Sequence, residues 1–414
     1  MKGNAAEERL ESLLDEEYSH AQARAQTSYD IAARERGENI VLFGAGRFGR
    51  TVNRKLRELQ IQPLAFADNN PALWGTKIDD TIVISPKEAA ESFGQRAVFV
   101  VCIWNGEAHD RMADRIRQLK TVGCEVVLSF GFLFWKYHQV FLPHYCLDLP
   151  EKVLLQRERI HAAMQLWSDD YSREEFVAQV GFRTTIDYDL IRRSVEGKHY
   201  FPPNLYSLAE DEVFVDCGAY DGDTILDFVD ETRGRFHSIF PFEPDGVTYP
   251  RLLQRISQLE DGVRERVHPL QAAVGRKPGT ISFEATGSML SVAGSGTSVV
   301  PVADLDSALG SLDPTFIKFD VEGFEPEALM GASQLLSRTR PILAVSAYHE
   351  QSHLWRIPLL LSSILPDRYE FFLRPHGAES WDLVCYAIPC ERVIARARCV
   401  EERTPYGKDP LANR

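Results

Sequence analysis

The feature that most constrains the fold is one stretch of residues 212–224, with the sequence EVFVDCGAYDGDT. A short apolar run ends in Asp216, and Gly218 and Gly222 follow before apolar residues recur at helical spacing. This order is typical of a buried parallel strand, a tight glycine turn and a helix. In such a unit glycine lets backbone approach a ligand, and ligands bind beyond the carboxyl ends of the strands. The turn carries Asp221 rather than Lys or Arg, so it suits a ligand with hydroxyl groups or positive charge better than a polyphosphate.

Strand and helix patterns keep alternating after this turn. Apolar runs end in acidic residues at Glu243 and Asp320, and further runs occupy residues 267–270, 342–347 and 383–388. An acid at the tip of the second strand can accept hydrogen bonds from both hydroxyls of a ribose. Residues 280–284 alternate like a hairpin strand, and residues 287–296 are expected to form a loop over the site. The pattern predicts an α/β protein whose second domain is a seven-stranded, doubly wound sheet.

A second glycine turn lies nearer the amino terminus. Residues 40–43 are apolar and lead into GAGRFG, where Gly44, Gly46 and Gly49 form a GxGxxG pattern before a helical stretch. The next apolar run ends at Asp68, roughly 20 residues on, as in dinucleotide-binding units. We therefore predict a first Rossmann-like domain that binds a nucleotide or nucleotide-sugar, or that serves only as a scaffold.

The residues after Asp68 add a likeness. Asn69-Asn70-Pro71 and Trp74-Gly75 resemble the small Rossmann-like domain that begins some sugar-modifying enzymes of polysaccharide biosynthesis. That resemblance implies nucleotide or nucleotide-sugar binding. A NAD-linked sugar-modifying enzyme is an alternative, but redox use of NAD is not expected, because no Tyr-x-x-x-Lys or Cys–His set accompanies the turn.

The remaining segments complete the domain plan. A charged helix with a leucine stripe, residues 5–36, is expected to pack on its own domain or on a partner subunit in a homo-oligomer. The aromatic-rich residues 126–147 are expected to be buried at a domain interface. The predicted organisation is an N-terminal helix (1–37), a Rossmann-like domain (38–147), a helical connector (148–204), a second α/β domain (205–395) and a charged tail (396–414).

Composition limits the partners. The formal charge of −14 argues against general nucleic-acid binding, since phosphate contacts need a basic face. No apolar run reaches the roughly 18–20 residues that a membrane span requires. The acidic start, without an apolar core, shows no secretory signal. The 7 cysteines lack CxxC spacing and fit a reducing, cytoplasmic environment.

The second domain also resembles a known family. The segments VDCGAYDGDT, PFEPD, LDSAL and IKFDVEGFEPEALMGA are similar to those of FkbM-type S-adenosylmethionine-dependent methyltransferases, and the likeness covers roughly residues 205–395. It implies methyl transfer from S-adenosylmethionine to a hydroxyl of a carbohydrate, nucleotide-linked sugar or natural product. Tyr220 and Phe324 depart from the commonest family pattern, and these departures bear on the identity of the acceptor.

The resemblance also implies roles for individual residues. Asp216, Gly218 and Asp221, with Gly222 in the same turn, would line the methionine and ribose part of the cofactor. Glu243 would hold the ribose diol, and Ala272 would lie near the adenine. Asp320 and Glu322 would face the transferring methyl group.

Transfer to a sugar hydroxyl calls for a group that draws off its proton. Asp320, Glu322 and His349 are the candidates, and a hydrogen-bonded structural histidine is the alternative for His349. A metal site from Asp320, Glu322 and Glu325 is conceivable. It is not expected, because in-line methyl transfer does not require a metal. A two-domain protein that binds a nucleotide or sugar without turnover is the rival function.

Overall fold

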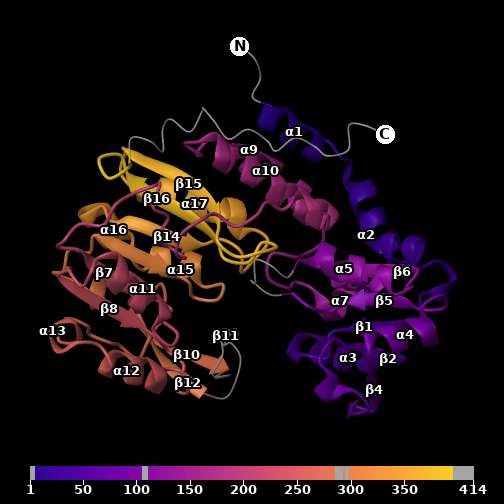
Figure 1. The fold of residues 1–414 in the computed structure, drawn as a ribbon. Coiled ribbons are helices and arrows are strands. Elements are labelled where there is room, and N and C mark those ends of the chain that lie inside the picture. The colour runs from indigo at the N-terminus through magenta and orange to yellow at the C-terminus, as the bar shows by residue number, and fades with distance from the viewer. Residues whose placement is uncertain (1–4, 105–110, 285–291, 294–297, 395–414) are drawn as a thin grey trace, which may run out of the picture.

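The computed structural model describes residues 5–104, 111–284, 292–293 and 298–394. Two six-stranded, mostly parallel sheets lie on opposite sides of the molecule, with helices around them (Figure 1). This is the α/β class expected from the sequence. The tail 396–414 lies outside the described residues, as does most of the loop expected at 287–296. Among the described residues, no helix is long and apolar enough to cross a membrane.

The first sheet is built around the amino-terminal glycine turn. Its strand order is β3-β4-β2-β1-β5-β6, parallel except where β3 meets β4. The central strands are apolar and fully buried, as strands covered on both faces must be. Its elements are β1 (Ile40–Phe43), α3 (Arg47–Glu58), β2 (Ala65–Ala67), β3 (Lys77–Ile78), β4 (Thr81–Ile84), α4 (Pro86–Phe93), β5 (Val98–Val101), α5 (Met112–Thr121) and β6 (Val126–Ser129).

The second sheet is built around residues 212–224. Its order is β15-β16-β14-β13-β7-β8, and β16 is the one strand that runs in the direction opposite to the other five. Its strands are β7 (Val213–Cys217), β8 (Ser238–Phe242), β13 (Phe316–Phe319), β14 (Ile342–Ser346), β15 (Tyr369–Pro375) and β16 (Leu383–Pro389). Its helices include α11 (Asp223–Glu231), α12 (Tyr249–Ser257), α13 (Asp261–Arg264), α14 (Leu305–Ala308), α15 (Glu325–Met330), α16 (Ser333–Thr339) and α17 (His353–Ile364).

The predicted seventh strand, residues 267–270, is not a full strand, so the sheet has six strands. The segment still runs parallel to β8 and pairs with it through isolated bridges at Val267 and Leu270. Pro241 in β8 has no N–H to donate, which leaves a gap in the ladder between these bridges. A separate four-stranded sheet follows, formed by β9 (Ala273–Val274), β10 (Gly279–Glu284), β11 (Val292–Ala293) and β12 (Ser298–Ala303). The expected hairpin strand at 280–284 lies in β10.

The predicted single amino-terminal helix is two helices. Helix α1 (Ala5–Leu14) buries its leucines in the core of the second sheet, whereas α2 (Tyr18–Ala33) buries Tyr29 in the core of the first. Residues 15–17, between the two helices, are all acidic and offer no apolar side chain to either core, and the backbone of Glu17 is extended. The break lets one segment serve two cores. Both helices pack on this same chain, against α10 and α6.

Helices also occupy the predicted connector and the aromatic segment. The connector contains α8 (Glu151–Leu154), α9 (Arg157–Met164) and α10 (Asp170–Thr185), of which α10 packs on β15 and α9 on α17. The aromatic segment contains α6 (Phe130–Lys136) and α7 (His138–Phe141), and its aromatic side chains are largely buried. Beyond α7, Tyr145 packs against the cores of both sheets. The division into domains at these boundaries stays a prediction.

Candidate active site

Three predicted site residues occupy one row across the carboxyl edge of the second sheet. Cys217 of β7 pairs with Phe319 of β13 on one side and with Phe242 of β8 on the other. The next residues along these parallel strands, Asp320, Gly218 and Glu243, therefore lie at the same level. The chain leaves β7 toward β8 and returns on its other side as β13, so this edge is the topological switch point where open α/β sheets bind ligands.

The glycine turn fits closely against this row. Gly218 has φ +85°, and a Cβ at that position would lie 1.9 Å from the carbonyl oxygen of Asp320. Only glycine tolerates both the backbone conformation and the contact. Gly222, also with positive φ, precedes helix α11.

Asp216 is fully buried and paired with Lys318 of the neighbouring strand. The Lys318 Nζ donates to Asp216 Oδ1 at 2.8 Å and to the Gly218 carbonyl at 2.7 Å. Burial raises the pKa of Asp216, although Lys318 opposes this. Burial alone would lower the pKa of Lys318, but Asp216 and Asp320 together raise it. The pair therefore fixes the glycine turn to the sheet. Asp216 Oδ2 makes no hydrogen bond.

Glu243 holds the turn from the other side. Its carboxylate accepts hydrogen bonds from the Tyr220 N–H at 2.9 Å and the Asp245 N–H at 2.8 Å. Burial raises the pKa of Glu243 to about 7, and the two backbone donors oppose that shift. Each carboxylate oxygen can accept more than one hydrogen bond, so both oxygens keep capacity for a ligand.

Two further predicted cofactor contacts, Asp221 and Ala272, lie near the carboxyl edge of the second sheet. Asp221 is paired with Arg255 of α12 at 2.7 Å, so its charge is already matched. Ala272 is half-buried and follows the segment that runs beside β8.

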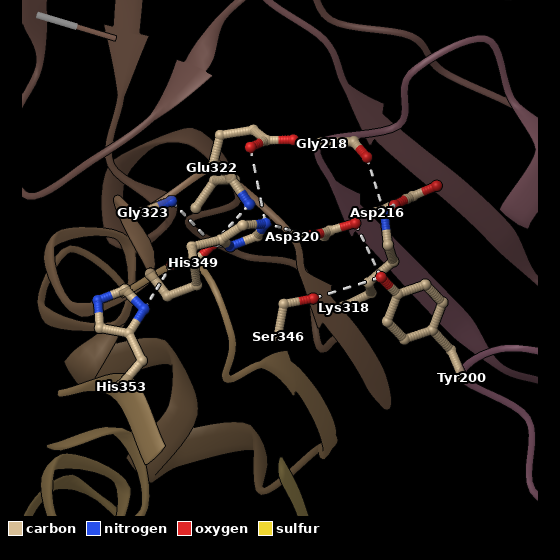
Figure 2. A network of polar contacts seen from close by, with 12 residues as sticks. Tyr200, Asp216, Gly218, Lys318, Asp320, Glu322, Gly323, Ser346, His349 and His353 are labelled. Carbon is tan, nitrogen blue, oxygen red and sulfur yellow. Dashed lines mark hydrogen bonds and ion pairs between the residues drawn. The ribbon is translucent and has the colours of Figure 1, made fainter. Parts of the chain in front are cut away.

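Asp320 is anchored from one side only. Its Oδ2 accepts a hydrogen bond from the Tyr200 hydroxyl at 2.8 Å, and Tyr200 also lies 3.4 Å from Ser346 Oγ at the end of β14 (Figure 2). Its Oδ1 makes no hydrogen bond and lies 3.4 Å from His349 Nε2. Tyr200 therefore orients the carboxylate so that the free oxygen faces the histidine.

His349 stands among carboxylates. Its Nδ1 lies 2.8 Å from Oε1 of Glu325, which is fully buried. Its Nε2 lies 3.7 Å from Glu322 Oε2 (Figure 2). Burial alone would lower the pKa of His349, but Glu325 and Glu322 raise it to about 10. Burial raises the pKa of Glu322 to about 8. Burial opposes ionisation of Glu325, yet His349 and His353 together hold its pKa well below the usual range.

The first sheet repeats this strand and glycine-turn architecture, separately from the acidic cluster formed by Asp320, Glu322 and Glu325 around His349. Gly44 lies in a row with Cys102 and Asp68, because Phe43 pairs with Val101 and Ala67. The Asp68 carboxylate accepts hydrogen bonds from the N–H groups of Ala45 at 2.6 Å and Asn70 at 2.7 Å. In this row buried Cys102 stands where the second sheet has Asp320.

The other two glycines of that turn differ in their surroundings. A Cβ at Gly49 would lie 1.9 Å from the Gly44 carbonyl oxygen, whereas Gly46 is open. The structure therefore places Gly44, Gly46, Gly49 and Asp68 together, on a different sheet from the other predicted site residues.

Residues 216–373 match the family model described as the methyltransferase FkbM domain. The chain therefore contains an FkbM methyltransferase domain. This match confirms the family resemblance drawn from the sequence, and it includes the acidic row, the glycine turn and His349.

One solved structure gives the same fold over most of its length. A methyltransferase FkbM from Methylobacillus flagellatus KT is 21% identical, with a TM-score of 0.73 over 92% of this chain and 99% of that chain. Precorrin-6y C5,15-methyltransferase from Geobacter metallireducens GS-15 is 14% identical, covering 44% of this chain and 80% of that chain with a TM-score of 0.28. Aeropyrum pernix fibrillarin with natively bound S-adenosyl-L-methionine is 14% identical, covering 44% of this chain and 69% of that chain with a TM-score of 0.28. These two superpose too poorly to add an argument. No curated protein matches the sequence.

Four residues take part in the candidate site through contacts that sequence reasoning did not predict, although Glu325 had been considered as a metal ligand. They are Tyr200, Lys318, Glu325 and Asp382. Asp382 is half-buried, and its pKa is raised to about 6, first by desolvation and then by Asp320. Lys318 carried a usable signal, because a lysine inside the apolar run FIKF must find a buried acid. Tyr200 and Asp382 lie far from the motifs in sequence and carried none.

Proposed function

We propose that this protein is an S-adenosylmethionine-dependent O-methyltransferase acting on a hydroxyl of a carbohydrate, nucleotide-linked sugar or natural product. The observation that carries the proposal is the row of Glu243, Gly218 and Asp320 at the switch point of an FkbM methyltransferase domain. It joins a diol-accepting carboxylate, a glycine turn and a second carboxylate on one edge.

The residues present fit that cofactor. Glu243 keeps free acceptor capacity on a buried carboxylate, which suits the two ribose hydroxyls. The acidic surroundings of the turn suit a sulfonium cation, and Asp216 Oδ2 is a buried oxygen without a hydrogen-bond partner. Asp216, Gly218, Asp221, Gly222 and Ala272 are the further proposed contacts. When bound, the cofactor supplies an already activated methyl group.

The chain's own contribution is to place and deprotonate the acceptor. Lys318 and Glu243 fix the glycine turn from two sides, so the turn is already in place before a cofactor binds. Asp320, Glu322 and His349 converge beside that turn and are the proposed catalytic residues. A carboxylate oxygen that accepts the hydrogen bond of an acceptor hydroxyl is also placed to take its proton.

The first sheet is proposed to bind a nucleotide or nucleotide-sugar, which would bring a nucleotide-linked acceptor to the chain. The support is the turn at Gly44–Gly49 with Asp68 at the next strand end.

Activity is tested by incubating the protein with a cell extract and a methyl-labelled donor, then finding labelled products by mass spectrometry. We expect a labelled hydroxylated small molecule. Asp320→Asn should lower turnover roughly 10²-fold or more while changing donor affinity little, because Asp320 is placed on the acceptor side. Donor binding without labelling of any acceptor would favour the non-catalytic binding protein instead. Unchanged turnover in Asp320→Asn would remove that residue from the chemistry.

A further inference from the structure

A buried imidazole nitrogen points at two carboxylate oxygens beside the glycine turn. The side chain of His349 is 2% exposed, and its Nε2 makes no hydrogen bond. Asp320 Oδ1 lies 3.4 Å away, and Glu322 Oε2 lies 3.7 Å away. An unpartnered polar atom in such a place costs free energy unless something else binds it.

The spacing of these atoms suits a metal ion. Ligand atoms that share a first-row divalent ion at about 2.1 Å lie about 3.0–3.5 Å apart in octahedral or tetrahedral geometry. The 3.4 Å between His349 and Asp320 falls in that range, and the 3.7 Å to Glu322 is slightly longer. The side chains of Asp320 and Glu322 are each about one-quarter exposed, at 24% and 26%, whereas the atoms Asp320 Oδ1 and His349 Nε2 are buried, so the set lies just beneath the surface.

The residues behind this set hold two of the three ligands in place. Glu325, which is fully buried, accepts at Oε1 from the Val321 N–H at 2.9 Å and faces His349 Nδ1 at 2.8 Å. With the Nδ1 proton facing Glu325, a metal ion would replace the proton on Nε2 and bind the lone pair there, which is the carboxylate–histidine–metal arrangement of metalloproteins. Tyr200 in turn occupies Asp320 Oδ2 and leaves Oδ1 free.

The backbone presents Glu322 to the same point. Glu322 has φ +53° and is followed by Gly323 with φ +99°, so two successive left-handed residues turn the chain between β13 and α15. A non-glycine residue held in this conformation is uncommon and marks functional sites. Asp320, Glu325 and His349 also offer one ligand atom each within 4.8 Å of one another. Because Glu325 is already bonded behind the imidazole, Glu322 is the better third ligand.

We propose that Asp320 Oδ1, Glu322 Oε2 and His349 Nε2 bind one divalent metal ion of the first transition row. A ligand set of one imidazole and two carboxylates suits such an ion. This goes against the expectation from the sequence, where methyl transfer gave no reason for a metal.

Three protein ligands leave coordination positions open. Resting on the proposed function, the ion would bind the acceptor hydroxyl, orient it and lower the pKa of that hydroxyl, and its proton would pass to the Glu322 oxygen that does not bind the ion. Glu325 is then a positioning residue, since it acts through His349.

The test is calorimetric titration of Mn²⁺ into the full-length protein after removal of metals with EDTA. We expect one ion per chain, also seen as a change in the electron paramagnetic resonance spectrum of Mn²⁺. His349→Ala and Asp320→Asn should each weaken binding tenfold or more. Glu325→Gln should weaken it about 10–100-fold, because the ligand orientation is lost. His268→Ala, at an exposed histidine on the same domain, is the matched control and should bind as wild type.

Failure of wild type to bind Mn²⁺, or unchanged binding in His349→Ala, would overturn the metal site. If Glu325→Gln fails to fold by circular dichroism, Glu322→Gln, which alters a proposed ligand at a partly exposed side chain, should still weaken Mn²⁺ binding, and unchanged binding in that variant would overturn the site. Titration of S-adenosylmethionine into the same samples separates the two proposals. Mn²⁺ binding without S-adenosylmethionine binding would overturn the proposed function alone, and the reverse result would overturn the metal site alone.

Discussion

At the scale of single residues, the pair of Asp216 and Lys318 sets the geometry of the site. Lys318 is 2% exposed and its ammonium is shared between Asp216 and the Gly218 carbonyl. Desolvating two charges is costly, and a buried pair offsets that cost only when both partners are present. The arrangement is therefore better explained by its hold on the glycine turn than by a gain in stability.

Lys318→Met should lower the free energy of unfolding by about 3–5 kcal/mol at pH 7, because it leaves the Asp216 carboxylate buried without a counter-ion. The measurement is chemical denaturation followed by circular dichroism. The double variant Asp216→Asn/Lys318→Met serves as the control and should regain part of the loss. Equal destabilisation in the single and double variants would show that the charge pair is not the cause.

Glu243 makes stability depend on pH. Burial raises its pKa in the folded chain to about 7, above the ordinary 4.5. Its contribution to stability is therefore full below about pH 4.5 and is lost as pH rises through about 7. Each pKa unit corresponds to about 1.4 kcal/mol, so the free energy of unfolding should fall between pH 4.5 and 8 by roughly 3 kcal/mol more in wild type than in Glu243→Gln. Denaturant titrations at both pH values measure this difference, and parallel curves for the two proteins would contradict it.

The acidic strand ends could be predicted at this scale, since each follows an apolar run directly. Their partners could not, because Tyr200 reaches Asp320 across 120 positions of the sequence. Side-chain contacts of that kind depend on packing that no local pattern encodes.

At the scale of elements, both sheets use the same strand–turn–helix unit, and in each an acid at the second strand end accepts a hydrogen bond from the turn. Glu243 bonds the Tyr220 N–H and Asp68 bonds the Ala45 N–H. The units differ at the neighbouring strand, where one has Asp320 and the other buried Cys102. Only the second sheet therefore presents a second carboxylate in its row.

Gly218→Ala should lower stability by more than about 2 kcal/mol and weaken S-adenosylmethionine binding, because φ is +85° and the added Cβ would overlap the Asp320 carbonyl. Gly46→Ala is the matched control in the other turn, since φ is −73° and nothing lies within 4 Å of the added atom. Thermal unfolding of both variants checks this. A harmless Gly218→Ala would mean that the turn does not require glycine.

Element types were largely predictable from apolar runs and glycine turns, but two details were not. The seventh strand is reduced to isolated bridges because Pro241 interrupts the ladder. The amino-terminal helix breaks because its leucines and Tyr29 serve different cores, which only the tertiary structure decides.

At the scale of the whole molecule, aromatic side chains join the two sheets beside the acidic cluster. Trp104, which follows β5 of the first sheet, lies 4.8 Å from Trp381 between β15 and β16, measured between ring centroids. Tyr145 lies 4.8 Å from Trp381 and 6.2 Å from His349 by the same measure. Tyr145, which packs against the cores of both sheets, is thereby a neighbour of the candidate site. Figure 1 shows the two sheets that these side chains connect. The sequence indicated a buried aromatic interface at 126–147, but not which side chains would meet.

The central claim, that the second sheet binds S-adenosylmethionine through its acidic row, is tested most directly by calorimetric titration of that compound into wild type, Glu243→Ala and Asp68→Ala. The two variants remove equivalent acids from equivalent turns, and circular dichroism shows whether each is folded. We predict that Glu243→Ala weakens binding roughly tenfold or more, through loss of charge-assisted hydrogen bonds to the ribose, while Asp68→Ala binds as wild type. Unchanged affinity in folded Glu243→Ala, or loss of binding only in Asp68→Ala, would contradict the account.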